Sequence, residues 1–82
     1  MARILYFGRL TDVTGQSFQT LPLPSDVWDT AGLRRWADDS HGGSGALLDE
    51  TVRIAINNEI VSEPAAVSDT DEIAFMPPVG GG

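Results

Sequence analysis

Five short stretches of the chain are rich in apolar, β-branched and aromatic residues, and several alternate apolar with polar positions. A two-residue period is typical of a strand with one buried face. The stretches that predict strands are residues 3–7, 17–21, 51–56, 60–61 and 72–76. The turn-prone segments that separate them include residues 11–15, Asn57-Asn58 and residues 68–71. Pro22 and Pro24 end the second strand, because proline removes a ladder donor.

The pattern changes after Trp28 to the period of an amphipathic helix. The apolar residues that share one helical face are Ala31, Leu33, Trp36 and Ala37, and the charged residues on the other sides are Arg34, Arg35, Asp38 and Asp39. The glycine-rich segment 41–45 then predicts the end of the helix, since glycine readily takes a left-handed conformation.

The start of this helix is best explained by Asp29 as its N-cap. A carboxylate there can accept the free amides of the first turn and lies at the positive end of the helix dipole. With that cap, Trp28 and Leu33 would form a hydrophobic staple. An earlier cap at Ser25 or Asp26 remains an open alternative.

The order of these elements, ββαβββ, suggests an α+β fold. A hairpin, one main helix and further strands that cover the helix are typical of the β-grasp roll, a mixed sheet with one main helix. In that fold the first and last strands lie side by side. We expect a single domain over residues 1–78 and a flexible tail over residues 79–82, because Pro77 and Pro78 prevent the sheet or a helix from continuing.

The amino-acid composition excludes several kinds of catalytic and metal site. The 82 residues carry a net charge of −7, with no cysteine and no lysine. This excludes disulfides, thiolate nucleophiles, CxxC zinc or redox pairs, Schiff bases and a P-loop lysine. An acidic surface repels phosphate backbones, so we expect basic protein partners and no nucleic acid. No apolar run approaches the ~20 residues of a membrane span or resembles a signal peptide, so we expect a soluble, cytoplasmic protein with no membrane partner.

Conventional catalytic and metal sites find little support in the sequence. His41 is the single histidine and lies in the glycine loop, where we interpret it as a solvated loop residue. Asp38-Asp39 and the acidic run 69–72 lack the glycine and glutamate of an EF-hand, so no metal site is expected. We interpret Trp28 and Trp36 as core or rim packing.

The last eight residues are the most informative segment, Phe75-Met76-Pro77-Pro78-Val79-Gly80-Gly81-Gly82. The carboxylate of Gly82 is unhindered, and the missing Cβ atoms let the backbone lie close to a nucleotide or to a partner's wall. In extended form residues 79–82 would reach about 13–14 Å at ~3.3–3.6 Å per residue, enough to thread a narrow tunnel. An acyl-adenylate at Gly82 would be open to attack by sulfur, which gives a thiocarboxylate. A frayed chain end without function is the alternative.

The facing of the first and last strands predicts an apolar patch beside the tail. If Ile4, Tyr6, Ile73 and Phe75 point toward the helix, the residues that point away include Leu5, Phe7, Ala74 and Met76. Exposed patches of this kind mark interfaces in soluble proteins. A minor second core under the loop at residues 21–24 is the alternative.

The sequence resembles the small subunits of molybdopterin synthase, a family of ubiquitin-like sulfur carriers. The matching segments are Leu5-Tyr6-Phe7, Leu33-Arg34, residues 52–57 and, above all, residues 71–82. The combination of Asp-Glu, Pro-Pro-Val and a terminal Gly-Gly is more specific than a Gly-Gly end alone. One departure is Gly80, where a small polar residue commonly precedes the glycine pair in the family.

The resemblance implies a carrier without catalytic activity of its own. An adenylating, E1-like enzyme would use ATP and magnesium to activate Gly82, and sulfur would replace AMP. The tail would then enter the large synthase subunit, with which a heterotetramer is expected, and donate sulfur to cyclic pyranopterin monophosphate. No cofactor would stay bound to the chain itself. The residues expected to contact partners, besides the reactive Gly82 and its neighbour Gly81, are Leu5, Phe7, Ala74, Met76, Pro77, Pro78, Val79 and Gly80.

Three other functions remain open at this stage. A sulfur carrier of thiazole synthesis and a ubiquitin-like protein modifier share the fold and the glycine end. A passive β-grasp binding module, with frayed glycines, belongs to a different class.

Overall fold

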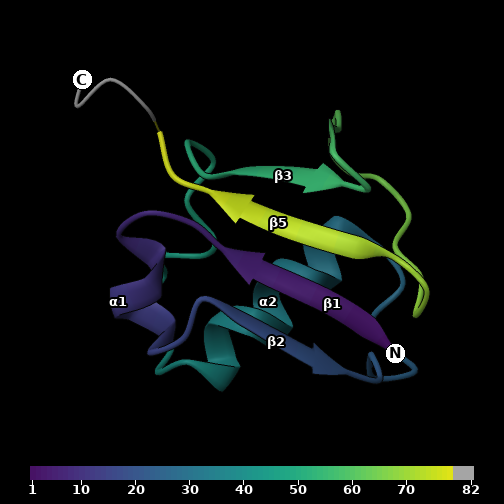
Figure 1. The fold of residues 1–82 in the computed structure, drawn as a ribbon, viewed down its shortest axis with the longest axis horizontal. Helices are drawn as coiled ribbons and strands as arrows, with labels where there is room; N and C mark the ends of the chain where they lie inside the picture. The colour runs from purple at the N-terminus through teal and green to yellow at the C-terminus, as the bar shows by residue number, and fades with distance from the viewer. Residues whose placement is uncertain (79–82) are drawn as a thin grey trace.

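A computed structural model describes residues 1–78 of the chain. It contains five strands and two helices in this part (Figure 1). In chain order these are β1 (Ala2–Tyr6), α1 (Leu10–Thr14), β2 (Phe18–Leu21), α2 (Thr30–Ser40), β3 (Arg53–Ile56), β4 (Glu59–Ile60) and β5 (Glu72–Met76). The five predicted strands and the main helix are therefore confirmed, and the strand ends differ from the prediction by two residues at most.

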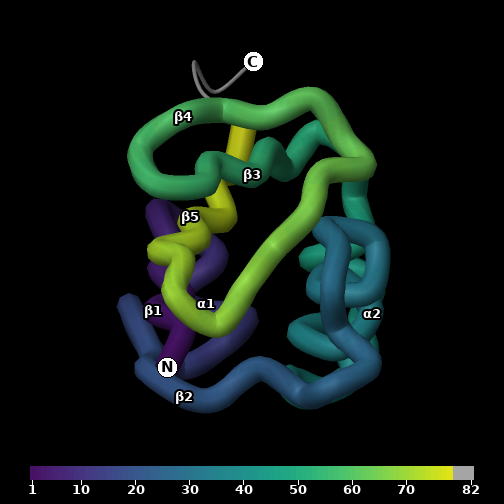
Figure 2. The backbone as a smooth tube through the Cα atoms, turned by 90° about the vertical axis from the view of Figure 1, so that its right-hand side faces the viewer, coloured from purple at the N-terminus to yellow at the C-terminus, as the bar shows by residue number. Residues whose placement is uncertain are grey.

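The strands form one mixed sheet in the order β2-β1-β5-β3-β4. The first and last strands, β1 and β5, are parallel neighbours at its centre, as predicted, and the other adjacent pairs are antiparallel. Helix α2 packs across one face of the sheet and leaves the opposite face open (Figures 1 and 2). This arrangement is the ubiquitin-like β-grasp fold, and it confirms the predicted fold class.

The core lies between the sheet and α2. In β1, buried residues alternate with more exposed ones, as the two-residue period requires, whereas the three central residues of β5 are all buried. The buried residues of the core cluster are Ile4, Tyr6, Leu10, Val27, Leu33, Ala37, Leu47, Val52, Ile54, Val67, Ile73 and Phe75. Each large apolar side chain stabilises the fold by roughly 1.5–3 kcal/mol. Within residues 1–78, no helix has the length and apolar character needed to cross a membrane.

The predicted N-cap is confirmed. The carboxylate of Asp29 accepts a hydrogen bond from the amide of Gly32 at 2.8 Å, and α2 begins at the next residue. The predicted staple is wrong, because the Trp28 side chain is 68% exposed. Val27 is the buried residue of this segment instead. Trp36, in contrast, packs partly buried against the core, as expected of a rim residue.

The segment predicted as a turn after the first strand is the short helix α1. Leu10 is buried and Val13 packs against the core, a spacing of three residues that places both on one helical face. The hydroxyl of Thr14 donates to the carbonyl of Leu10 at 3.1 Å, and Gly15 ends the helix in a left-handed conformation with φ 74°. The polar and glycine residues here therefore cap a helix rather than form an open turn.

Two charged residues assigned to the outer sides of the main helix are buried, Arg34 and Asp38. The Asp38 carboxylate accepts hydrogen bonds from the amides of Gly45, at 3.0 and 3.2 Å, and of Leu47, at 3.4 Å. Both residues are tolerated inside because their polar atoms are paired with the loop that follows α2. Their burial is a consequence of tertiary contacts that helical periodicity does not show.

His41 is not the solvated loop residue that the sequence suggested. Its ring lies edge-on to Tyr6, with ring centres 5.5 Å apart, and its Nδ1 lies 2.8 Å from the carbonyl oxygen of Ala37. The Tyr6 hydroxyl donates to Gln19 at 2.8 Å, and burial raises the pKa of this phenol. His41 thus helps to join the end of α2 to β1.

Candidate functional site

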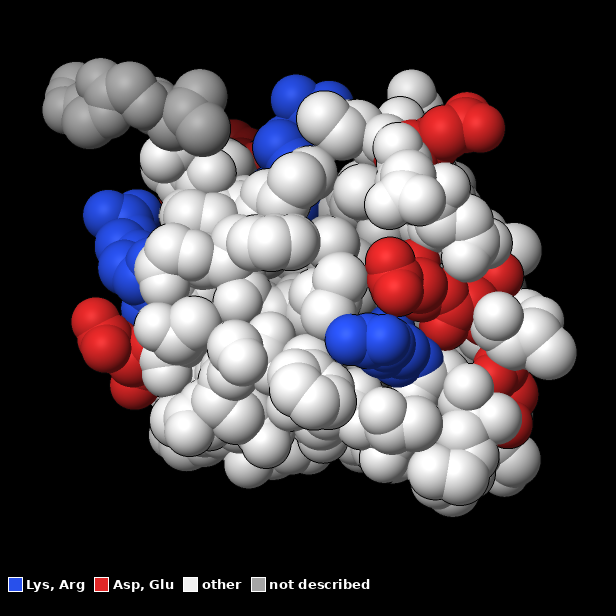
Figure 3. Space-filling model, in the orientation of Figure 1, with Lys and Arg blue, Asp and Glu red and all other residues white. Residues whose placement is uncertain are grey.

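The open face of the sheet carries a row of apolar residues that crosses all five strands. Strand register places these residues side by side. The members of this apolar row, from one edge of the sheet to the other, are Phe18, Leu5, Ala74, Ala55 and Ile60. Figure 3 shows a broad area of uncharged side chains across this face, with charged side chains in small groups around it.

The four residues of the predicted patch lie together on this face. Leu5 and Ala74 are register partners, and Phe7 and Met76 follow them toward the ends of β1 and β5. Phe7 is 47% exposed, whereas Ala74 is only 8% exposed. Their proximity and outward facing agree with the strand pattern, but their role in binding stays a prediction.

A groove of about 310 Å³ runs along the apolar row. The small side chains of Ala55 and Ala74 form its floor, since both are nearly buried although they face outward. The larger residues around them are Leu5, Phe7, Ile60 and Met76, with Asn58 and Glu72 as polar neighbours. The loop at residues 21–24 does not cover this groove, because Leu21 and Leu23 pack against the main core. The alternative of a second small core is therefore wrong.

Sequence reasoning missed three members of the apolar row, Phe18, Ala55 and Ile60. Each lies on a strand that was predicted, so its facing was available from the two-residue period. The missing information was the register, which sets Phe18 opposite Leu5 and Ala55 opposite both Ala74 and Ile60. Register depends on the paired strands and not on either strand alone.

The tail root, Pro77 and Pro78, begins where the apolar row meets the end of β5. The amide of Phe7 donates to the carbonyl of Phe75 at 3.1 Å, which extends the parallel pairing of β1 and β5 by one residue. Pro77 lies so close to Gly8 that a Cβ atom on this glycine would be 2.9 Å from Cγ of the proline. The contact between Gly8 and Pro77 therefore places the residue that follows β5 against the turn that follows β1.

Two shallow hollows join the tail root to the open face. One of about 350 Å³ is lined by Phe7, Gly8, Met76 and Pro77. The other, of about 460 Å³, has Ile60, Met76, Pro77 and Pro78 beside the polar residues Glu50, Thr51 and Arg53. Together with the groove they form one continuous apolar surface. The predicted site residues Val79, Gly80, Gly81 and Gly82 lie outside the described residues.

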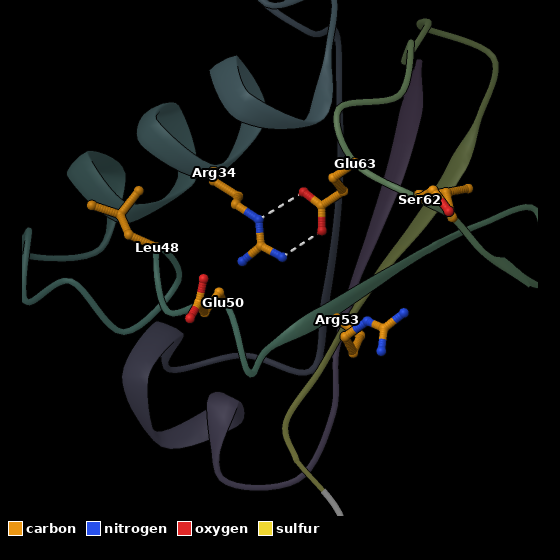
Figure 4. Close-up of a pocket in the computed structure, with 7 residues that line it drawn as sticks. Arg34, Leu48, Glu50, Arg53, Ser62 and Glu63 are labelled. Atoms are coloured by element: carbon orange, nitrogen blue, oxygen red, sulfur yellow. Dashed lines mark hydrogen bonds and ion pairs between the residues drawn. The ribbon is translucent and has the colours of Figure 1, made fainter.

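A separate polar pocket of about 360 Å³ lies between α2, the loop before β3 and the segment after β4 (Figure 4). At its base the Arg34 guanidinium faces the Glu63 carboxylate, with Nε to Oε1 at 2.9 Å and Nη2 to Oε2 at 2.6 Å. Hydrogen bonds from Arg34 hold the pKa of Glu63 below its usual range.

The remaining donors of Arg34 are also engaged. Its Nη1 donates to the carbonyls of Leu47 at 2.9 Å and Asp49 at 3.1 Å, and its Nη2 donates to the carbonyl of Val52. A guanidinium with this many protein partners has no free donor to offer a ligand. Arg34 therefore ties the loop between α2 and β3 to the helix, and its function is structural.

The described part of the chain brings no set of candidate metal ligands together. Among residues 1–78, no three side chains of histidine, cysteine, aspartate or glutamate gather closely enough to hold a metal ion. The open face instead has the composition of a docking surface, apolar at its centre and polar at its margins.

Comparison with known proteins gives both a family and structural neighbours. The ThiS family matches residues 4–82. The molybdopterin synthase sulfur carrier subunit of Escherichia coli is 31% identical over 83 residues, and the match covers 100% of both chains.

Solved structures show the same fold at lower identity. SAMP1, the small archaeal modifier protein 1 of Haloferax volcanii, has a TM-score of 0.74 with 20% identity, and the match covers 99% of this chain and 98% of that chain. Subunits 1 and 2 of the molybdopterin-converting factor of Helicobacter pylori have been solved as a complex. The matched chain has a TM-score of 0.67 with 22% identity, covering 99% of this chain and 97% of that chain.

Proposed function

Because the chain belongs to the ThiS family, we propose that it is the sulfur carrier subunit of a molybdopterin synthase. The observation that carries the proposal is the junction of β5 with the open face. The strand ends at Met76 beside the apolar groove, and Pro77 packs against Gly8. The end of β5 and Pro77 thus lie at the margin of an apolar surface suited to docking, which supports the proposal. The full-length similarity to the Escherichia coli carrier supports this assignment.

The chemistry of the proposal takes place at the carboxylate of Gly82. An activating enzyme would use ATP and magnesium, the carboxylate would attack the α-phosphate, and pyrophosphate would leave. Sulfide delivered by a sulfur donor would then displace AMP from the acyl-adenylate to give a thiocarboxylate. The three glycines at residues 80–82 suit both steps, since nothing beyond the backbone obstructs the carbonyl carbon.

Sulfur transfer would occur inside the large subunit. The thiocarboxylate sulfur would attack a carbon of the pterin substrate, cyclic pyranopterin monophosphate, and the bond from that carbon to its oxygen would break as the carbon–sulfur bond forms. Hydrolysis of the bond between the Gly82 carbonyl carbon and sulfur would return the carboxylate and leave the sulfur on the pterin. The carrier contributes the reacting group and a docking surface, and the catalytic groups belong to its partners. We propose that two carriers and two large subunits assemble as a heterotetramer.

Intact-mass measurement tests this proposal. The chain is co-expressed with its adenylating enzyme and a sulfur source, and the expected product has gained the mass difference of one oxygen replaced by one sulfur. A variant that lacks Gly81 and Gly82 is the matched control and should show no gain at unchanged thermal stability, because chain ends contribute little to the core.

Other results would assign the chain differently. An unmodified mass in the presence of active partner enzymes would favour the passive binding module. Recovery of Gly82 in an amide bond to lysine side chains of other proteins would favour a protein modifier. Transfer of sulfur to a thiazole precursor instead of the pterin would favour the thiazole pathway.

A further inference from the structure

Phe18 is an aromatic residue on an edge strand of the open face, and half of its side chain is exposed to solvent. It lies directly opposite Leu5 in the antiparallel pair of β1 and β2. It is therefore the outermost member of the apolar row on the β2 side, where the sheet ends. Neither the core nor the tail root explains an exposed phenylalanine at this position.

The Phe18 ring is held by a charged neighbour. The guanidinium of Arg3 lies over the ring, 5.1 Å from its centre, a geometry in which the cation is attracted to the aromatic face. The Glu72 carboxylate lies 4.0 Å from the Nε of Arg3 and faces the same guanidinium. A ring restrained in this way loses little conformational entropy when a partner covers it.

The tail side of the open face is too small for a stable complex by itself. Specific interfaces bury about 800 Å² of surface on each partner, whereas a large aromatic side chain supplies about 150–250 Å² when fully covered. Phe7 is already half-buried and Ala74 almost completely so. The tail that enters the partner adds to this area, but the outward residues beside the tail root supply little of it, so we expect the interface to extend across the sheet.

The direction of that extension follows from the neighbouring residues. Toward the start of β1 and β5 the outward positions become charged, with the register partners Arg3 and Glu72. Along the apolar row they remain apolar to both sheet edges. We propose that Phe18 is an anchor for the large subunit, so that the docking surface reaches from the tail root to the β2 edge.

This inference rests on the proposed function, because that function identifies the large subunit as the protein that covers Phe18. A partner that receives the tail must approach at Pro77 and Pro78, and the hollows there are continuous with the groove that contains Leu5. Leu5 is in turn the register neighbour of Phe18. A second copy of this chain, paired through the β2 edge, is the other possible occupant.

The test compares two exposed aromatic residues on different surfaces. Phe18→Ala and Trp28→Ala each remove a large exposed ring, but Trp28 precedes α2 and does not belong to the open face. Affinity for the large subunit of the source organism's molybdopterin synthase is measured by titration calorimetry with the full-length chain. We expect Phe18→Ala to weaken binding at least about tenfold and Trp28→Ala less than about twofold, as for an interface anchor and a remote residue.

The possible outcomes separate the two proposals. If the wild-type chain neither binds the large subunit nor acquires sulfur, the proposed function fails. If the wild-type chain binds and Phe18→Ala binds equally well, the anchor is disproved while the function stands. If Phe18→Ala changes only the self-association seen in sedimentation, a second copy covers this residue and the inference is overturned. Should Phe18→Ala fold poorly, Phe18→Leu keeps an apolar strand residue and is expected to retain intermediate affinity.

Discussion

Gly8 lies in the turn after β1 and packs against Pro77 of the tail root. Its φ is +55°, a left-handed value that favours glycine, and it has no side chain to collide with Pro77. The sequence marks Gly8 as a break after the first strand. It does not show the contact with Pro77, because these residues are distant in the chain and meet only through the parallel pairing of β1 and β5.

Gly8→Ala is expected to lower the free energy of unfolding by about 1–2 kcal/mol, since the new Cβ adds both backbone strain and a collision. Gly15→Ala is the matched control, because Gly15 also has a positive φ, of 74°, but a Cβ there meets nothing within 4 Å. Urea denaturation of both variants measures the difference. Equal losses would show that the contact between Gly8 and Pro77 contributes nothing.

Arg34 links three segments of the chain through its guanidinium group. From the middle of α2 it reaches the segment before β3 and the segment after β4. The helical pattern assigned it to the solvent side. Only the positions of three backbone carbonyls and of Glu63 reveal why a guanidinium is buried here, and those groups are brought together by the fold.

Arg34→Met is expected to lower the free energy of unfolding by about 3 kcal/mol, because it leaves carbonyls and the Glu63 carboxylate without their donor. Arg35→Met changes the neighbouring, exposed arginine in the same way and should stay within about 0.5 kcal/mol of the wild type. Chemical denaturation at neutral pH provides the comparison. A similar small loss in both variants would contradict the structural role of Arg34.

Glu63 makes stability depend on pH. Its pKa in the folded state is lowered, mainly by hydrogen bonds from Arg34. Near the ordinary glutamate pKa, the folded state therefore binds fewer protons than the unfolded state. The resulting stabilisation is present above about pH 4 and is lost as the pH falls through the lower folded value.

Glu63→Gln should therefore reduce stability at pH 7 by about 1 kcal/mol and should reduce it less at pH 3, where the wild-type carboxylate is becoming protonated. The measurement is the midpoint of urea unfolding at both pH values. Glu59→Gln, in the exposed strand β4, is the control. An equal effect of Glu63→Gln at both pH values would contradict the ion pair as the cause.

Local sequence patterns were sufficient to predict most secondary-structure elements. They failed where contacts between distant segments determine which residues are helical or buried. Asn57 and Asn58 have the positive φ values expected of a turn between strands, and β5 has the bounds that its sequence predicts. The helix α1 was missed because Leu10 and Val13 are too few to establish a helical period. Arg34 and Asp38 were misplaced because the loop that buries them follows the helix in the chain.

The molecule as a whole has two different faces on one sheet, a closed face under α2 and an open apolar face that ends at the tail root. The sequence predicted the tail-side half of the open face from strand facing. The remaining residues, Phe18, Ala55 and Ile60, required the register across β2, β3 and β4. Roles for residues 79–82 come from composition and family resemblance.

Phe7→Asp is expected to weaken association with the large subunit at least about tenfold, because it places a charge in the apolar docking surface. The thermal unfolding temperature should change little, since Phe7 follows β1 and is half-exposed. Calorimetric titration and thermal unfolding are measured on the same preparation. Wild-type affinity in this variant would remove Phe7 from the docking surface.

The parallel pairing of β1 with β5 also has a consequence during synthesis. The strand made first acquires its central neighbour only from the strand made last, so a ribosome must complete β5 before the sheet can close. A nascent chain that stops before Glu72 lacks β5, so no strand lies between β1 and β3. A product that lacks β5 therefore cannot complete the sheet, and the native fold is reached only after nearly the whole domain has been made.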